Sequence, residues 1–134
     1  MQRMYVLTAM TLGLTAGLLL AQSDSDYQGY MKIVGPTNGS LQKNLAAKDG
    51  SAAAADAKKL EDTFKQVQAF WEKRNVPDAI NFAKQAQSGA AAVAKSAMAG
   101  NIDQASADAK TMATNCAGCH MAHREKTESG FKIK

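Results

Sequence analysis

The stretch SAAAADAKKLEDTFKQVQAFWEKR, residues 51–74, carries the clearest structural pattern in this chain. Its main apolar residues follow one another at steps of four, three, four, three and four positions. They are Ala53, Ala57, Leu60, Phe64, Val67 and Trp71. Such spacing keeps side chains on one face of a helix with 3.6 residues per turn. The stretch therefore predicts a long amphipathic helix that buries this face.

The residues that follow predict a second helix of the same kind. Pro77 suits the first turn of a helix, because its missing N–H would have no partner there. A stripe then continues along Phe82, Ala86, Ala90, Val93 and Ala97. Gly100 is expected to end this helix, since glycine readily adopts the conformation that follows a helix end.

A last helix is predicted to begin at Asn101, which can cap it, with Gln104 at the third position. Its apolar stripe is Ile102, Ala105, Ala109, Met112, Cys116 and Cys119. We expect this helix to run on into MAHREK, residues 121–126.

Upstream, a further helical register is interrupted by Gly35 and Pro36. Its members are Tyr27, Met31, Val34, Leu41 and Leu45. Proline inside a helix removes a hydrogen bond and clashes with the preceding turn, so we expect a kink or a break there.

These helices, joined by short links, predict an all-α fold, an antiparallel up-down-up-down four-helix bundle. A chain of 134 residues with 46% hydrophobic but only 6% aromatic residues suits one small domain. No segment alternates with period two over a useful length. The net charge of +4 is spread along the chain, which favours no nucleic-acid partner.

Residues 1–21, MQRMYVLTAMTLGLTAGLLLA, predict a secretory signal peptide. Arg3 stands in a short polar start, and an apolar run then ends at the small residue Ala21. A retained membrane anchor is the alternative, because the run from Met4 is near the minimum that spans a bilayer. We favour cleavage, which leaves residues 22–134 as an exported, periplasmic domain without a membrane segment.

Both cysteines and both histidines of the chain fall within eight residues, in TNCAGCHMAHREK, residues 114–126. A disulfide between Cys116 and Cys119 would close too short a loop to stabilise the fold. A thioredoxin-like pair would need a preceding strand. Zinc would need four ligands around a tetrahedron, whereas Cys116, Cys119, His120 and His123 share one helical face.

The remaining interpretation is Cys-x-x-Cys-His, the attachment site of a c-type haem. Two thiols on one helical turn can add to the two vinyl groups at one edge of the porphyrin, and His120 can bind the iron. The sequence thus predicts one haem c, held covalently by Cys116 and Cys119. His123 lies on the same side as His120, so we expect it to be a surface histidine near the haem edge.

A haem motif at the end of a four-helix bundle resembles the class II cytochromes c, the cytochrome c-prime family. The matching stretch is AGNIDQASADAKTMATNCAGCHMAHREK, with Arg124 at the family's basic position after the histidine. The match is weaker over YMKIVGPTNGSL. The chain departs from the family at Tyr27, where members often carry an arginine, so the pairing of the haem propionates is not inherited.

The resemblance implies that His120 is the proximal iron ligand and that the first helix covers the other face. Met31 then occupies the distal position and is the expected sixth ligand, and Arg124 lies near the haem. Methionine-ligated members carry single electrons between redox partner proteins. The alternative is a high-spin member that binds nitric oxide or carbon monoxide. No acid–base pair for an enzyme stands out, and the resemblance allows a homodimer.

Overall fold

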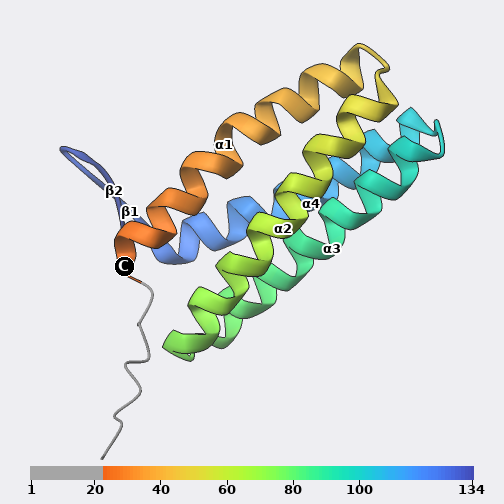
Figure 1. The fold of residues 1–134 in the computed structure, drawn as a ribbon. Coiled ribbons are helices and arrows are strands. Elements are labelled where there is room, and N and C mark those ends of the chain that lie inside the picture. The colour runs from red at the N-terminus through yellow and green to blue at the C-terminus, as the bar shows by residue number, and fades with distance from the viewer. Residues whose placement is uncertain (1–22) are drawn as a thin grey trace, which may run out of the picture.

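A computed structural model describes residues 23–134 as a bundle of four helices followed by a short hairpin (Figure 1). The helices are α1 (Asp24–Ala46), α2 (Gly50–Arg74), α3 (Pro77–Met98) and α4 (Ile102–His123). The strands are β1 (Arg124–Thr127) and β2 (Gly130–Ile133). The predicted signal peptide and its cleavage point lie outside the described residues.

The helices run up, down, up and down, and each packs against the next along the chain (Figure 1). This confirms the predicted bundle. The α2 stripe is buried at every predicted position, and Phe70 joins it in the core. Small residues allow close approach between helices. A Cβ atom on Gly89 would stand 2.9 Å from the Cβ of Met112, so α3 and α4 pack too tightly there for any larger residue.

The helix ends follow the sequence signals. Pro77 is at the start of α3, and the side chain of Asn101 accepts a hydrogen bond from the Gln104 amide at the start of α4. Gly100, which precedes it, has a φ of +74°, a conformation that costs glycine little. These three features were predicted and are confirmed.

A kink or a break was expected at Pro36, and helix α1 is continuous across this residue, so the helix does not break there. Proline removes only the bond to the carbonyl of Lys32, and both Lys32 and Pro36 are exposed, where water can solvate that carbonyl. Buried Val34, Thr37 and Leu41 hold the helix to the core on both sides of the proline.

The last helix runs into the stretch MAHREK as expected, but it ends at His123, so residues 124–126 are not part of it. Arg124 has an extended backbone, with φ −118° and ψ 134°, and begins an antiparallel hairpin. Residues Glu128 and Ser129 form the turn, and Gly130 follows with a φ of +138°, which only glycine adopts readily. The backbone N–H of Lys134 donates to the His123 carbonyl at 3.0 Å and ties the hairpin to the end of α4.

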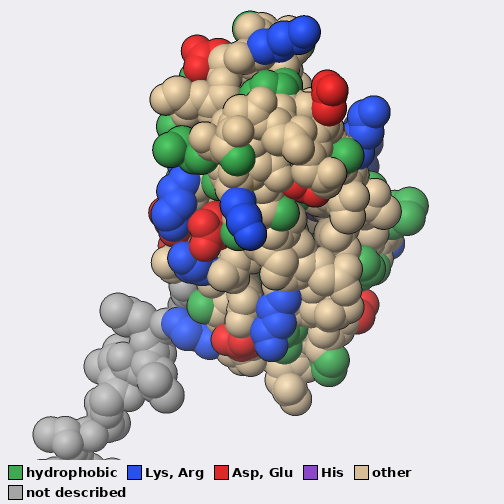
Figure 2. Space-filling model, turned by 90° about the vertical axis from the view of Figure 1, so that its right-hand side faces the viewer, with side chains coloured by type: hydrophobic (Ala, Val, Ile, Leu, Met, Phe, Trp, Pro, Cys, Tyr) green, Lys and Arg blue, Asp and Glu red, His purple; other side chains and the backbone are tan. Residues whose placement is uncertain are grey.

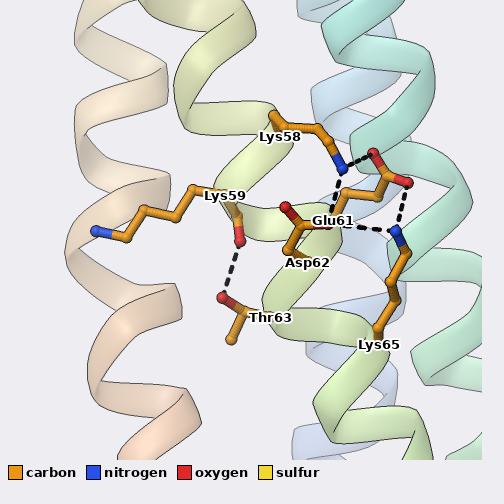
Figure 3. Close-up of polar contacts among 6 residues, drawn as sticks. All are labelled: Lys58, Lys59, Glu61, Asp62, Thr63 and Lys65. Atoms are coloured by element: carbon orange, nitrogen blue, oxygen red, sulfur yellow. Dashed lines mark hydrogen bonds and ion pairs between the residues drawn. The ribbon is translucent and has the colours of Figure 1, made fainter.

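The exposed surface carries mixed charge. On the face drawn in Figure 2, lysines and arginines are interspersed with aspartates and glutamates. Figure 3 shows one such group on α2, in which the Lys58 and Lys65 amines both lie within 3.3 Å of Glu61 and Asp62 carboxylate oxygens. Exposed pairs of this kind contribute little to stability. Within residues 23–134, no helix has the combination of length and apolarity needed to cross a bilayer.

Candidate functional site

The Cys-x-x-Cys-His residues lie on the face of α4 that turns toward the bundle. Cys119 is buried, whereas Cys116 and His120 are partly buried. Positions three and four apart on a helix are neighbours on its surface, so the three side chains form one compact group. The two cysteines are not joined by a disulfide.

A small cavity of about 30 Å³, which we call the thiol cavity, lies against this group. Cys116, Cys119 and His120 line one side of it. Residues of the other three helices complete it, and they include Met31, Phe64 and Phe82. Its wall is almost wholly apolar.

A larger cavity of about 470 Å³, which we call the hairpin cavity, opens between α1, the end of α4 and the hairpin. Met31 and Lys32 line it from α1, His120 from α4, and Arg124 and Phe131 from the hairpin. Its volume is within the range of sites that bind small molecules and cofactors.

The two cavities are adjacent, because four residues line both of them. These are Tyr27, Met31, Val34 and His120. The cavities exist because α1 and α4, the first and last helices, contact each other little. Helices that follow one another in the chain pack closely instead. The structure therefore brings Met31 together with His120 and both cysteines around one hollow.

Tyr27, a member of the helical register predicted for α1, is buried in the core beside the motif. Its side chain and the Cys119 thiol both line the thiol cavity, one turn of α1 away from Met31. Burial raises the pKa of the Tyr27 phenol and raises the pKa of the Cys119 thiol to about 11, although the nearby Tyr27 phenol opposes the shift at Cys119. Burial also raises the pKa of Cys116. Both thiols are therefore protonated at neutral pH.

Gly118, between the two cysteines, lets Phe82 of α3 pack directly on this turn. A Cβ atom on Gly118 would stand 2.6 Å from Cε1 of Phe82, a distance that real structures do not show. The aromatic ring thus takes the space that a side chain at position 118 would need. The helical spacing of Phe82 predicted its inward direction but not this contact.

Arg124 lines the hairpin cavity. It was expected to extend the last helix, but it is the first residue of strand β1. Its guanidinium carbon lies 4.2 Å from the centre of the Phe131 ring, a cation–π contact within the hairpin. Burial, and then the positive charge of Arg124, lower the pKa of His120. The imidazole is therefore neutral at pH 7, the form that can bind a metal ion.

His123, which was expected to be a surface histidine, is partly buried and makes two specific contacts. Its Nε2 atom lies 2.8 Å from Oδ2 of Asp78, and its ring centre is 5.1 Å from that of Trp71. The hydrogen bond from His123 lowers the pKa of the Asp78 carboxyl. His123 thus joins the end of α4 to the start of α3 and to the aromatic core.

Among residues 23–134, no group of three or more His, Cys, Asp and Glu side chains is arranged to hold a metal ion. Comparisons with protein-family models, with curated proteins and with solved structures gave no significant match. The resemblance to the class II cytochromes c therefore has no support from these comparisons.

Proposed function

We propose that this protein is a c-type cytochrome of the class II kind that carries single electrons between redox partner proteins. One observation carries the proposal: both cysteines of the Cys-x-x-Cys-His motif, His120 and Met31 line one hollow between α1 and α4. A haem bound there would supply the reversible one-electron chemistry of its iron.

The residues fit a haem in type and position. Cys116 and Cys119 are one helical turn apart and face the thiol cavity, as two thioether bonds to one edge of a porphyrin require. His120 is neutral and follows directly, which suits a proximal ligand. The hollow is flanked by apolar side chains and opens beside a cavity of about 470 Å³.

Met31 decides between an electron carrier and a gas-binding protein. It lies on the helix opposite His120 and lines both cavities, so its thioether is the candidate for the sixth position. Ligation by methionine and histidine keeps the iron six-coordinate and favours the ferrous state, which raises the reduction potential. An open sixth position would instead favour binding of nitric oxide or carbon monoxide.

Export is part of the proposal, because thioether attachment of haem in bacteria generally takes place outside the cytoplasm. The periplasm is therefore the expected location, with cleavage after Ala21. The intact mass of the mature chain measures that cleavage.

The test is to purify the exported protein and extract it with acidified organic solvent. Haem that stays with the protein establishes covalent attachment, and its loss contradicts the proposal. Cys116→Ser and Cys119→Ser together should release it. In the wild type, a low-spin ferrous spectrum that changes slowly under carbon monoxide supports an electron carrier, and rapid binding of carbon monoxide supports the gas-binding alternative.

A further inference from the structure

The thiol cavity and the hairpin cavity together form one hollow between α1 and α4, and the charge of its lining side chains differs between the two ends. No Asp, Glu, Lys or Arg lines the thiol cavity. The hairpin cavity is lined by three cations, Lys32 of α1, Arg124 of β1 and Lys132 of β2, and by no carboxylate. His120 and Met31 line both cavities and so lie between the apolar end and the cationic end.

The cations on the hairpin are held in place by contacts to the bundle. Gln28 of α1 donates through Nε2 to the Phe131 carbonyl at 3.3 Å. The Arg124 guanidinium packs over the Phe131 ring. The Lys134 amine donates to the Met121 carbonyl at 3.1 Å. The hairpin is therefore fixed beside the start of α1 (Figure 1), with its basic side chains at the rim of the cavity.

The charged groups of Lys32, Arg124 and Lys132 can donate further hydrogen bonds. Within residues 23–134, Arg124 and Lys32 form no ion pair with a carboxylate. Lys132 lies 3.3 Å from Glu125, but both side chains are more than half exposed, so this pair is weak. An ammonium group has three donors, and Lys132 can bind a second acceptor beside Glu125.

We propose that Lys32, Arg124 and Lys132 form a carboxylate-binding rim for the two propionate groups of the haem. This inference rests on the proposed function. The vinyl groups and the propionates occupy opposite edges of the porphyrin. Attachment of the vinyl edge at Cys116 and Cys119 therefore directs the propionates toward the cationic end of the hollow. Arg124 can bind a carboxylate through two parallel hydrogen bonds, which gives the hairpin a role in orienting the cofactor.

The test uses the holoprotein and the propionate bending modes of its resonance Raman spectrum, which respond to hydrogen bonding at the carboxylates. Arg124→Gln, Lys132→Met and Lys32→Met should each shift these modes to lower frequency, because a charged donor is lost. Arg124→Lys keeps the charge and should shift them less. Lys126→Met is the matched control: Lys126 is exposed on the same hairpin but does not line the cavity, and the modes should stay unchanged.

The haem content of each variant, measured separately, distinguishes the two proposals. A wild type without covalent haem overturns the proposed function and the rim together. Covalent haem with propionate modes that are the same in all three charge-removing variants overturns the rim alone. Shifts as large in Lys126→Met as in Lys132→Met would also overturn it, because net charge rather than contact would then be responsible. If Arg124→Gln acquires too little haem for a spectrum, the propionate modes of Lys32→Met and Lys132→Met alone test the rim.

Discussion

Met31 on α1 and His120 on α4 line the same two cavities, although their helices contact each other little. Elsewhere in the bundle neighbouring helices meet in a packed core, whereas Met31 and His120 line cavities between their helices. A thioether and a neutral imidazole on opposite walls are a suitable ligand pair for a haem iron. The arrangement gives the proposed function its most direct test.

Replacing Met31 by alanine should convert a low-spin haem protein into a high-spin one. If the thioether is the sixth ligand, its removal leaves the iron open to water and to gases. The ferric charge-transfer band of methionine ligation should disappear, and the ferrous protein should bind carbon monoxide rapidly. Optical spectra and stopped-flow mixing measure both changes.

Met121→Ala is the matched control for this substitution. Met121 is also a methionine near the motif, but its side chain is 76% exposed on α4. Its removal should leave the spin state and the carbon monoxide kinetics unchanged. A wild type that is already high-spin would show that Met31 is not a ligand, and Met31→Ala would then change little.

Replacing Gly118 by alanine should destabilise the turn of α4 that carries Cys116 and Cys119. Alanine favours a helix over glycine by up to about 1 kcal/mol. The new Cβ atom, however, would stand 2.6 Å from Cε1 of Phe82, and overpacking of this kind costs about 1–3 kcal/mol. We expect a net loss of about 1 kcal/mol in the free energy of unfolding, measured by chemical denaturation.

Two further variants separate the clash from the helix effect. Gly39→Ala lies inside α1, where an added Cβ meets no atom within 4 Å, and should raise stability by about 0.5–1 kcal/mol. The double variant Gly118→Ala with Phe82→Leu should recover part of the loss. A single Gly118→Ala variant as stable as Gly39→Ala would mean that Phe82 moves aside at no cost.

The bundle itself was predictable from the sequence because its signals are local and repeated. The α2 stripe from Ala53 to Trp71 is fully buried, and Pro77 and Asn101 mark helix starts where expected. The grouping of Cys116, Cys119 and His120 on one face follows from spacing alone. The presence of Met31 beside them was expected only from a family resemblance, and the structure supplies the shared cavities.

The hairpin was missed because each strand has only four residues, too few for a clear period-two pattern. The signals were present in retrospect: Ser129 followed by Gly130 marks a turn, and Phe131 and Ile133 alternate with polar residues. The contact between Tyr27 and Cys119 joins residues far apart in the chain, and no local pattern could predict it. The pairing of His123 with Asp78 is of the same kind.

Acid should loosen the first turn of α1 before the rest of the bundle. The Asp26 carboxylate accepts hydrogen bonds from the Ser23 amide at 2.7 Å and from its hydroxyl at 3.0 Å. The backbone bond, and then the side-chain bond, lower the pKa of Asp26 below 3.8. Its contribution is thus present above the pKa of the unfolded chain and is lost as the pH falls through the lower folded value.

Amide hydrogen exchange in the first turn of α1 measures this effect. Exchange, corrected for its intrinsic pH dependence, should accelerate at acid pH in the wild type. Asp26→Asn should show weaker protection at neutral pH and little further change on acidification. Equal protection in both proteins would show that the capping box contributes nothing to the helix that carries Tyr27 and Met31.

Pro36→Ala should stabilise the bundle, because α1 is a continuous helix in spite of the proline. A proline in a helix interior costs about 3 kcal/mol relative to alanine. Exposure of Pro36 and of the unbonded Lys32 carbonyl reduces that cost, so we expect a gain of about 1–3 kcal/mol in the free energy of unfolding.

The spectrum of the same variant tests whether Pro36 also sets the path of the helix segment that carries Met31. An unchanged low-spin spectrum would show that Met31 reaches its position without the proline, and a shift toward high spin would show that the proline is retained for the site at the expense of stability.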